Sequence, residues 1–123
     1  AAAKTAALIN VLMGAGITPK EIDRKGIEDI TRDQIEEAAA RGNVIKLICC
    51  GGIEAGKVVG RVRPEEISKS DLLASITGTS SIVTITTDLM GTISVVEEDP
   101  GIEQTGYGVF SDLLRLICKT HCE

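Results

Sequence analysis

Aromatic residues are almost absent from this sequence: Tyr107 and Phe110 are the only two among 123 residues, and tryptophan is missing altogether. Basic residues are also in the minority, since 13 Lys and Arg stand against 18 Asp and Glu and leave a net charge of −5. An acidic chain without aromatic side chains offers neither the electrostatic attraction nor the stacking surfaces that nucleic-acid-binding proteins use. We therefore exclude nucleic acid as a partner.

Long apolar runs and secretory signals are lacking as well. No apolar segment approaches the roughly 20 residues that a membrane-spanning helix needs. The small apolar residues at positions 1–3 lack the basic region and cleavage pattern of a signal peptide. We therefore expect a cytoplasmic protein with no membrane partner. Hydrophobic residues still make up 43% of the chain, which is enough for a core built from aliphatic side chains.

Residues for nucleophilic and metal chemistry are few. The one histidine, His121, lies two residues from the end, and the absence of a Gly-x-Ser-x-Gly motif argues against a Ser–His hydrolase. Cys49 and Cys50 are neighbours and would point to opposite faces of a strand, so they are poorly placed to share one ion. Together with Cys118 and Cys122, their spacing matches no zinc finger or ribbon. We expect reduced cytosolic thiols and no metal site.

Two glycine-rich segments invite a phosphate-binding interpretation. They are Gly51-Gly52 and residues 56–60, and neither is followed by a helical pattern. A dinucleotide fingerprint needs a strand, three spaced glycines and a helix whose N-terminus faces the diphosphate. The glycines therefore predict hairpin turns, and we expect no Rossmann-type nucleotide domain within residues 1–123.

The order of helical and extended patterns predicts an α+β fold, with a mixed, mostly antiparallel sheet and helices packed on one face. We expect it to form a single domain of residues 1–123. Thr31 and Gln34 have the spacing of a capping box, and Pro64 is expected to close a strand. The expected elements are a helix at 4–13, an extended piece at 21–27, a helix from 31 to 42, strands at 44–50 and 57–62, a helical turn at 72–74, strands at 81–87 and 92–96, and a helix at 105–120.

Five short segments of the chain stand out by their order and spacing. They are residues 1–8, Gly26-Ile27 with Ile30-Thr31, residues 44–47, residues 61–64 and residues 105–113. Together they resemble the C-terminal catalytic region of homoserine dehydrogenases, and the match spans nearly the entire chain. The resemblance implies the substrate-binding and dimerisation domain of an enzyme of amino-acid biosynthesis. That enzyme is a homodimer and interconverts homoserine, its small-molecule substrate, and aspartate semialdehyde with NAD or NADP.

The resemblance also implies a catalytic residue. In that family an Asp lies four residues before a Lys on one helix face, and both reach the substrate; the Lys matches Lys4, and its Asp would fall just before Ala1. Without the resemblance, a lysine in the first turn of a helix is expected to be an ordinary surface residue. Hydride can leave the hydroxyl carbon only if the hydroxyl proton leaves too, so Lys4 is expected to transfer that proton. Burial or a neighbouring cation would prepare a lysine for this role at neutral pH.

Cofactor contacts are implied near the other end of the chain. Gly101 and Thr105 match the last glycine and the threonine of the family's glycine-rich loop, which we expect to contact the cofactor. Glu98-Asp99-Pro100 departs from that pattern, and negative charge near a phosphate is unfavourable. Because the nucleotide-binding half is not within residues 1–123, no cofactor binding and no activity are expected of this piece alone.

Two other hypotheses stay open on the sequence. The first is an NAD(P)-dependent oxidoreductase of the same fold that acts on another small polar substrate. The second is a non-enzymatic module for ligand binding or self-association. Both NAD and NADP stay open as the cofactor.

Overall fold

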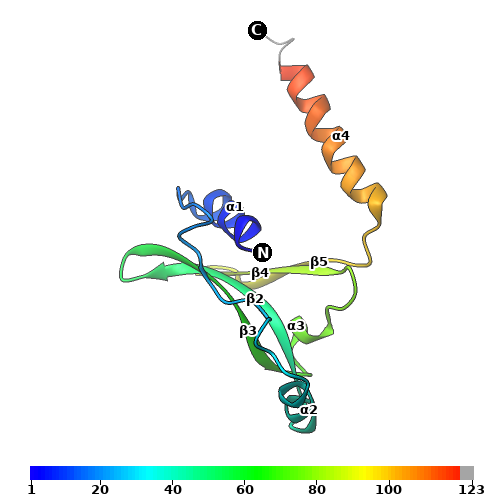
Figure 1. Ribbon diagram of the computed structural model, residues 1–123. Coiled ribbons are helices and arrows are strands. Elements are labelled where there is room, and N and C mark those ends of the chain that lie inside the picture. The colour runs from blue at the N-terminus through cyan, green and yellow to red at the C-terminus, as the bar shows by residue number, and fades with distance from the viewer. Residues whose placement is uncertain (120–123) are drawn as a thin grey trace. The chain divides into compact units, whose positions relative to one another are not determined.

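The computed structural model describes residues 1–119, and these residues form two compact units that divide between Ala74 and Ser75 (Figure 1). Helices and strands occur in both units, which confirms the α+β class. Among the described residues, none of the helices combines the length and the apolar character needed to cross a membrane.

The first unit is a three-stranded sheet with helices around it. Its strands have the order β1-β3-β2, with β1 parallel and β2 antiparallel to β3, so the expected mixed, mostly antiparallel sheet is confirmed. The elements are α1 (Ala2–Met13), β1 (Asp23–Arg24), α2 (Arg32–Ala40), β2 (Asn43–Glu54), β3 (Lys57–Ser68) and all but the last residue of α3 (Leu72–Ser75).

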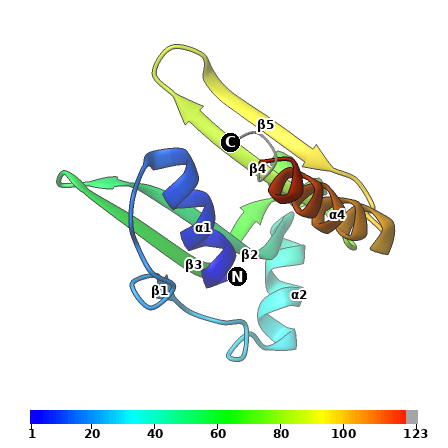
Figure 2. The ribbon, with the colours of Figure 1, turned by 90° about the horizontal axis from the view of Figure 1, so that it is seen from above.

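Helix α1 lies across one face of β2 and β3 (Figure 2). The register places Gly51 opposite Gly60, and the side chain of Ile9 sits over both glycines. A Cβ atom at Gly51 would lie 2.5 Å from Cγ1 of Ile9, so the absence of side chains allows this close approach. Ile9 packs there with Ala6, Ile22 and Val62, which form the buried core of the unit.

The β2–β3 hairpin is longer than the sequence pattern indicates. The turn expected between the two strands is confirmed: Ala55 and Gly56 both have positive φ, 49° and 77°, as a two-residue hairpin turn requires. The hairpin turn expected at Gly51-Gly52 is wrong, because both glycines lie within β2, where Gly51 pairs with Gly60 and Gly52 with Val59. The expectation that Pro64 closes the second strand is wrong, because β3 continues to Ser68 and Pro64 pairs with Leu47.

Strand geometry explains why Pro64 is tolerated. The carbonyl of Val62 accepts a hydrogen bond from the N–H of Lys25, so it points toward β1. Backbone groups two residues apart in a strand point to the same side, and the nitrogen of Pro64 therefore points to that side too. Strand β1 ends at Arg24, so β3 needs no hydrogen-bond donor at this position.

The predicted start of α2 is confirmed. The N–H of Gln34 donates to Oγ1 of Thr31, and Oε1 of Gln34 accepts from the N–H of Thr31 at 2.9 Å, so the capping box is complete. At the other end of the helix, Arg41 donates to both carboxylate oxygens of Glu66 on β3.

The predicted single turn at α3 is also confirmed, since Leu73 N–H donates to the carboxylate of Asp71 at 2.8 Å.

The second unit consists of a hairpin and a long helix. Strands β4 (Ser81–Thr87) and β5 (Gly91–Glu97) pair antiparallel, as expected, and α4 (Ile102–Lys119) follows. Helix α4 begins three residues earlier than the sequence pattern indicates. The N–H of Gly101 donates to Oε1 of Gln104 at 2.8 Å, which caps the helix at this earlier position.

Candidate functional site

Lys4, the expected catalytic residue, lies near the start of α1 on its exposed side. Thr5, Ala6 and Ile9 form the buried side of the helix. Lys4 instead shares its side with larger apolar residues: Leu8 is 45%, Val11 81% and Leu12 53% exposed. The structure thus presents Lys4 at the end of an uncovered apolar stripe, at helical spacings of four and seven or eight residues.

A small hollow adjoins the start of the same helix. It is lined by Ala1, Ala2, Arg24, Lys25, Gly26, Glu28 and Val62. Lys4 does not line this hollow, whereas Gly26 belongs to one of the segments that carry the family resemblance. None of the three charged lining residues was expected from the sequence, where the only signal for them is the concentration of charge around the short extended piece.

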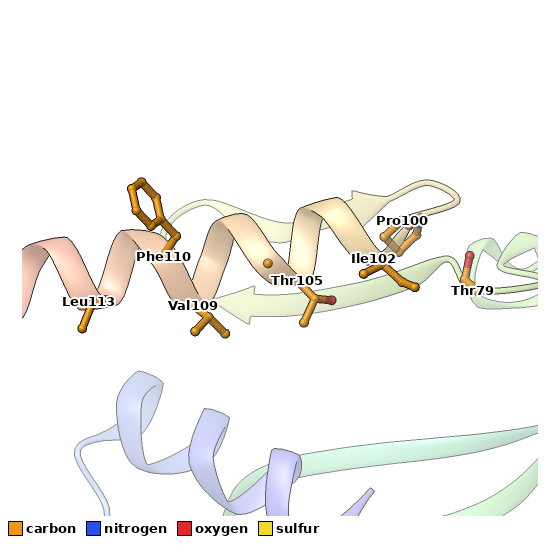
Figure 3. Close-up of a pocket in the computed structure, with 9 residues that line it drawn as sticks. Thr79, Pro100, Ile102, Thr105, Val109, Phe110 and Leu113 are labelled. Atoms are coloured by element: carbon orange, nitrogen blue, oxygen red, sulfur yellow. The ribbon is translucent and has the colours of Figure 1, made fainter.

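Gly101 and Thr105, the expected cofactor-binding residues, line one open hollow of about 850 Å³ in the second unit. Thr79, Pro100, Ile102, Gly106, Val109, Phe110 and Leu113 complete its lining. Figure 3 shows Thr105, Val109 and Leu113 projecting from one side of α4, whereas Phe110 points to another side. Most of this lining is apolar, and its side-chain hydroxyls come from Thr79 and Thr105.

The loop before α4 is held by its own side chains. The N–H of Asp99 donates to Oγ of Ser80 at 3.0 Å, and the same hydroxyl lies 3.2 Å from Oδ1 of Asp99. Asp99 has a positive φ of 41°, a conformation that Asp and Asn tolerate better than most residues. The segment Glu98-Asp99-Pro100, which departs from the glycine pattern of the family, therefore forms a defined turn.

Charge in this part of the chain has one sign. Residues 75–114 contain six Asp and Glu and no Lys or Arg. The next basic residue, Arg115, pairs with Asp112 at 3.5 Å. This segment therefore supplies no cation that could pair with the phosphates of a nicotinamide cofactor.

The part of the chain that the structure describes shows no metal-binding cluster. Cys49, Cys50 and Cys118 are free thiols, and residues 1–119 contain no group of three or more His, Cys, Asp or Glu side chains arranged to hold an ion. His121 and Cys122 lie outside the described residues.

The fold places the chain among α+β domains of dehydrogenases. The solved homoserine dehydrogenase of S. aureus superimposes with a TM-score of 0.81 at 30% identity, over 95% of this chain and 30% of that chain. That of Thiobacillus denitrificans gives a TM-score of 0.82 at 26% identity, over 91% of this chain and 26% of its own. Similarity at this level identifies the architecture.

The family model for homoserine dehydrogenase matches residues 1–114, and the chain belongs to the homoserine dehydrogenase family. A homoserine dehydrogenase of Methanocaldococcus jannaschii is 34% identical over 119 residues, which are 97% of this chain and 34% of that protein. An NAD(+)-dependent homoserine dehydrogenase of Pseudomonas canavaninivorans is 30% identical over 92% of this chain and 32% of its own length. The chain thus spans about a third of the length of these relatives.

Proposed function

We propose that residues 1–123 form the substrate-binding and dimerisation domain of a cytoplasmic homoserine dehydrogenase of amino-acid biosynthesis. The complete enzyme would interconvert homoserine and aspartate semialdehyde with NAD or NADP. The observation that carries the proposal is the position of Lys4, on the exposed side of α1, in a chain whose family match begins at residue 1. Gly101 and Thr105 would contact an uncharged part of the cofactor in the hollow beside α4.

The reaction needs two transfers from homoserine. When bound, NAD or NADP would supply the acceptor for the hydride that leaves the hydroxyl-bearing carbon. The hydroxyl proton must also leave as the carbonyl forms, and Lys4, as a neutral amine, is proposed to take that proton. In the reverse direction, the Lys4 ammonium returns the proton to the oxygen of the reduced aldehyde.

The surroundings of Lys4 support this role. Leu8, Val11 and Leu12 form an exposed apolar stripe beside it. We propose that the remainder of the enzyme covers this stripe, because apolar side chains gathered on one helix side are stabilised by burial. Covering the stripe would also shield Lys4 from bulk water.

Dimerisation is proposed to involve the sheet of the first unit. Strand β2 forms the edge of that sheet, is 12 residues long and contains no proline. A long edge strand presents backbone groups that pair readily with another chain. A homodimer formed through this edge would satisfy those groups.

Replacement of Lys4 in the full-length enzyme tests the catalytic assignment. Lys4→Ala should lower kcat by about 10²- to 10⁴-fold, the range typical for loss of a proton-transfer group, with little change in cofactor affinity. The measurement is steady-state oxidation of homoserine together with fluorescence titration of the reduced cofactor. Lys20→Ala, at another exposed lysine of the same unit, is the matched control and should leave both quantities unchanged. An unaltered kcat in Lys4→Ala would remove Lys4 from the mechanism.

A further inference from the structure

Two glycines lie inside α4, both near its beginning: Gly106 and Gly108. Glycine is disfavoured in the interior of a helix, because its backbone loses more conformational freedom on folding than that of any other residue. Relative to alanine, each glycine makes the helical state about fivefold less favourable than the unwound state. The first turns of α4 are therefore weak by composition.

Close packing does not explain these glycines in the part of the chain that the structure describes. A Cβ atom at Gly106 or at Gly108 would have no atom of another element within 4 Å, and residues 101–110 are all exposed. Further along the helix, Leu113 and Leu114 belong to a residue type that favours helices. The weakest part of α4 thus lies at its beginning, and the part beyond Gly108 is intrinsically more stable.

Helix geometry shows what the weak part controls. Each N–H in an α-helix donates to the carbonyl four residues earlier, so residues 106–109 donate the first four bonds of α4, and the glycines donate two of them. Ile102 and Thr105, which these bonds hold in the helix, line the hollow of the second unit, and Val109 and Leu113 continue its lining (Figure 3). The beginning of α4 is thus one end of the wall of the hollow.

We propose that residues 102–108 form a gate: this segment unwinds and rewinds while the rest of α4 stays helical, and the hollow opens and closes with it. The inference rests on the proposed function, in which part of NAD(P) occupies the hollow, and adds that the cofactor leaves when the gate opens. Opening of a few exposed residues costs far less free energy than global unfolding. Opening of such a segment limits the turnover of many enzymes.

Gly108→Ala in the full-length enzyme tests the gate. Gly108 does not line the hollow, so the added methyl group strengthens the helix without adding an atom to the lining. Amide hydrogen exchange should give protection factors for Tyr107 and Val109 about fivefold higher than in wild type, while those of Leu113 and Leu114 should change by less than twofold. Unchanged protection at Tyr107 and Val109 would overturn the proposal, and so would an equal rise at Leu113 and Leu114, because α4 would then open as a whole.

The rate at which the cofactor leaves is the second measurement. Stopped-flow displacement of bound NADH or NADPH should give dissociation about fivefold slower in Gly108→Ala than in wild type, because the open gate is populated less. Gly52→Ala is the matched control: it adds the same methyl group to β2, where it meets open space, and should change neither exchange in α4 nor dissociation.

The outcomes separate the gate from the proposed function. If wild-type enzyme binds neither NADH nor NADPH, the proposed function itself fails. If Gly108→Ala raises the protection factors of Tyr107 and Val109 but dissociates at the wild-type rate, the proposed function stands and the gate is refuted.

Discussion

Single side chains set how closely α1 approaches the sheet. A Cβ at Gly60 would collide with Cδ1 of Ile22 and would lie 2.8 Å from Cδ1 of Ile9. Gly52, in the partner strand, has nothing within 4 Å of the corresponding position. Both glycines lie in the same sheet, but an added methyl group would collide with core side chains at Gly60 and would meet open space at Gly52.

Gly60→Ala should destabilise the protein by about 1–3 kcal/mol, because the core must shift to admit the methyl group. Gly52→Ala should be neutral or slightly stabilising, since alanine restricts the unfolded chain more than glycine does. Urea unfolding of both variants measures the difference. Equal midpoints for the two would show that Ile9 and Ile22 do not depend on the glycine at position 60.

Glu66 stabilises the fold through its negative charge, which Arg41 and Asn43 contact. Arg41 donates two hydrogen bonds to its carboxylate and Asn43 donates a third, at 2.7 Å. These contacts, with the Arg41 hydrogen bond foremost, lower the pKa of Glu66 to about 2 from its ordinary value of 4.5. A lowered pKa in the folded state means that the ionised carboxylate stabilises the fold, and protonation removes that contribution.

The stabilisation from Glu66 should be fully present above pH 4.5 and should be lost as the pH falls from 4.5 toward 2. Wild type should therefore unfold at higher urea than Glu66→Gln at pH 7, and the gap should narrow below pH 4.5. Glu28→Gln, at an exposed glutamate of the same unit, should show no comparable narrowing. A gap that is constant from pH 7 to pH 2.5 would contradict this account.

Among the elements, those with strong local signals were predictable and those that depend on neighbours were not. The Thr31–Gln34 capping box determines where α2 begins within a few residues of sequence. The persistence of β3 beyond Pro64 depends on β1 ending at Arg24, 40 residues earlier in the chain, which no local pattern reveals. The same limit applies to α1, because apolar residues occupy two of its sides and the glycines of a distant hairpin decide which side is buried.

The residues of the candidate site, too, were only partly predictable from the sequence. The family resemblance implied that Gly101 and Thr105 both contact the cofactor, and they line one hollow. The charged residues beside the start of α1 could not be anticipated, because β1 brings Arg24 and Lys25 there through its pairing with β3. Lys4 was selected by the family resemblance alone, and its catalytic role stays a prediction.

The side chain of Asn10 ties α1 to the segment that leads to β1. Nδ2 of Asn10 donates to the carbonyl of Ile17, and Oδ1 of Asn10 accepts from the N–H of Ile17, both at 2.9 Å. This pair of hydrogen bonds holds Ile17 against the buried cluster around Ile9. The side-chain amide of Asn10 thus makes the two hydrogen bonds to the backbone of Ile17 that a neighbouring strand would make in a sheet.

Asn10→Ala should destabilise the protein by about 1–3 kcal/mol, because two partly buried backbone groups of Ile17 lose their partner. Hydrogen exchange at the Ile17 amide should also be faster in Asn10→Ala than in wild type. Asn10→Asp is the informative companion, since it keeps the acceptor and loses the donor, and the Ile17 amide should retain more protection than in Asn10→Ala. Identical exchange rates at the Ile17 amide in wild type and Asn10→Ala would show that these two hydrogen bonds do not hold Ile17 in place.

At the scale of the molecule, apolar side chains remain exposed along the helices of both units. In α4 they are Ile102, Tyr107, Val109, Phe110, Leu113, Leu114, Leu116 and Ile117. Exposed apolar surface of this extent marks a site of interaction. The chain spans about a third of its relatives, which supports the proposal that further parts of the enzyme cover these sides.

Residues 1–123 alone should bind neither NAD nor NADP detectably in titration calorimetry, because the nucleotide-binding half of the enzyme is proposed to lie outside them. The full-length enzyme, titrated under the same conditions, is the positive control. Binding to the 123-residue chain with micromolar affinity would show that this part contains a cofactor site of its own. It would overturn the proposal that the cofactor is bound mainly by another part of the enzyme.

The β2–β3 hairpin has a consequence for how the first unit folds. Its pairs run without interruption from Glu54–Lys57 at the turn to Asn43–Ser68 at the far end. Each pair brings together residues only slightly more distant in sequence than the pair before it, so little chain entropy is lost at any one step. The left-handed turn at Ala55-Gly56 is therefore a natural starting point for folding, from which the strands can close progressively. Helix α1, which is some 40 residues away in sequence from the glycines it rests on, would then dock on a hairpin that has already formed.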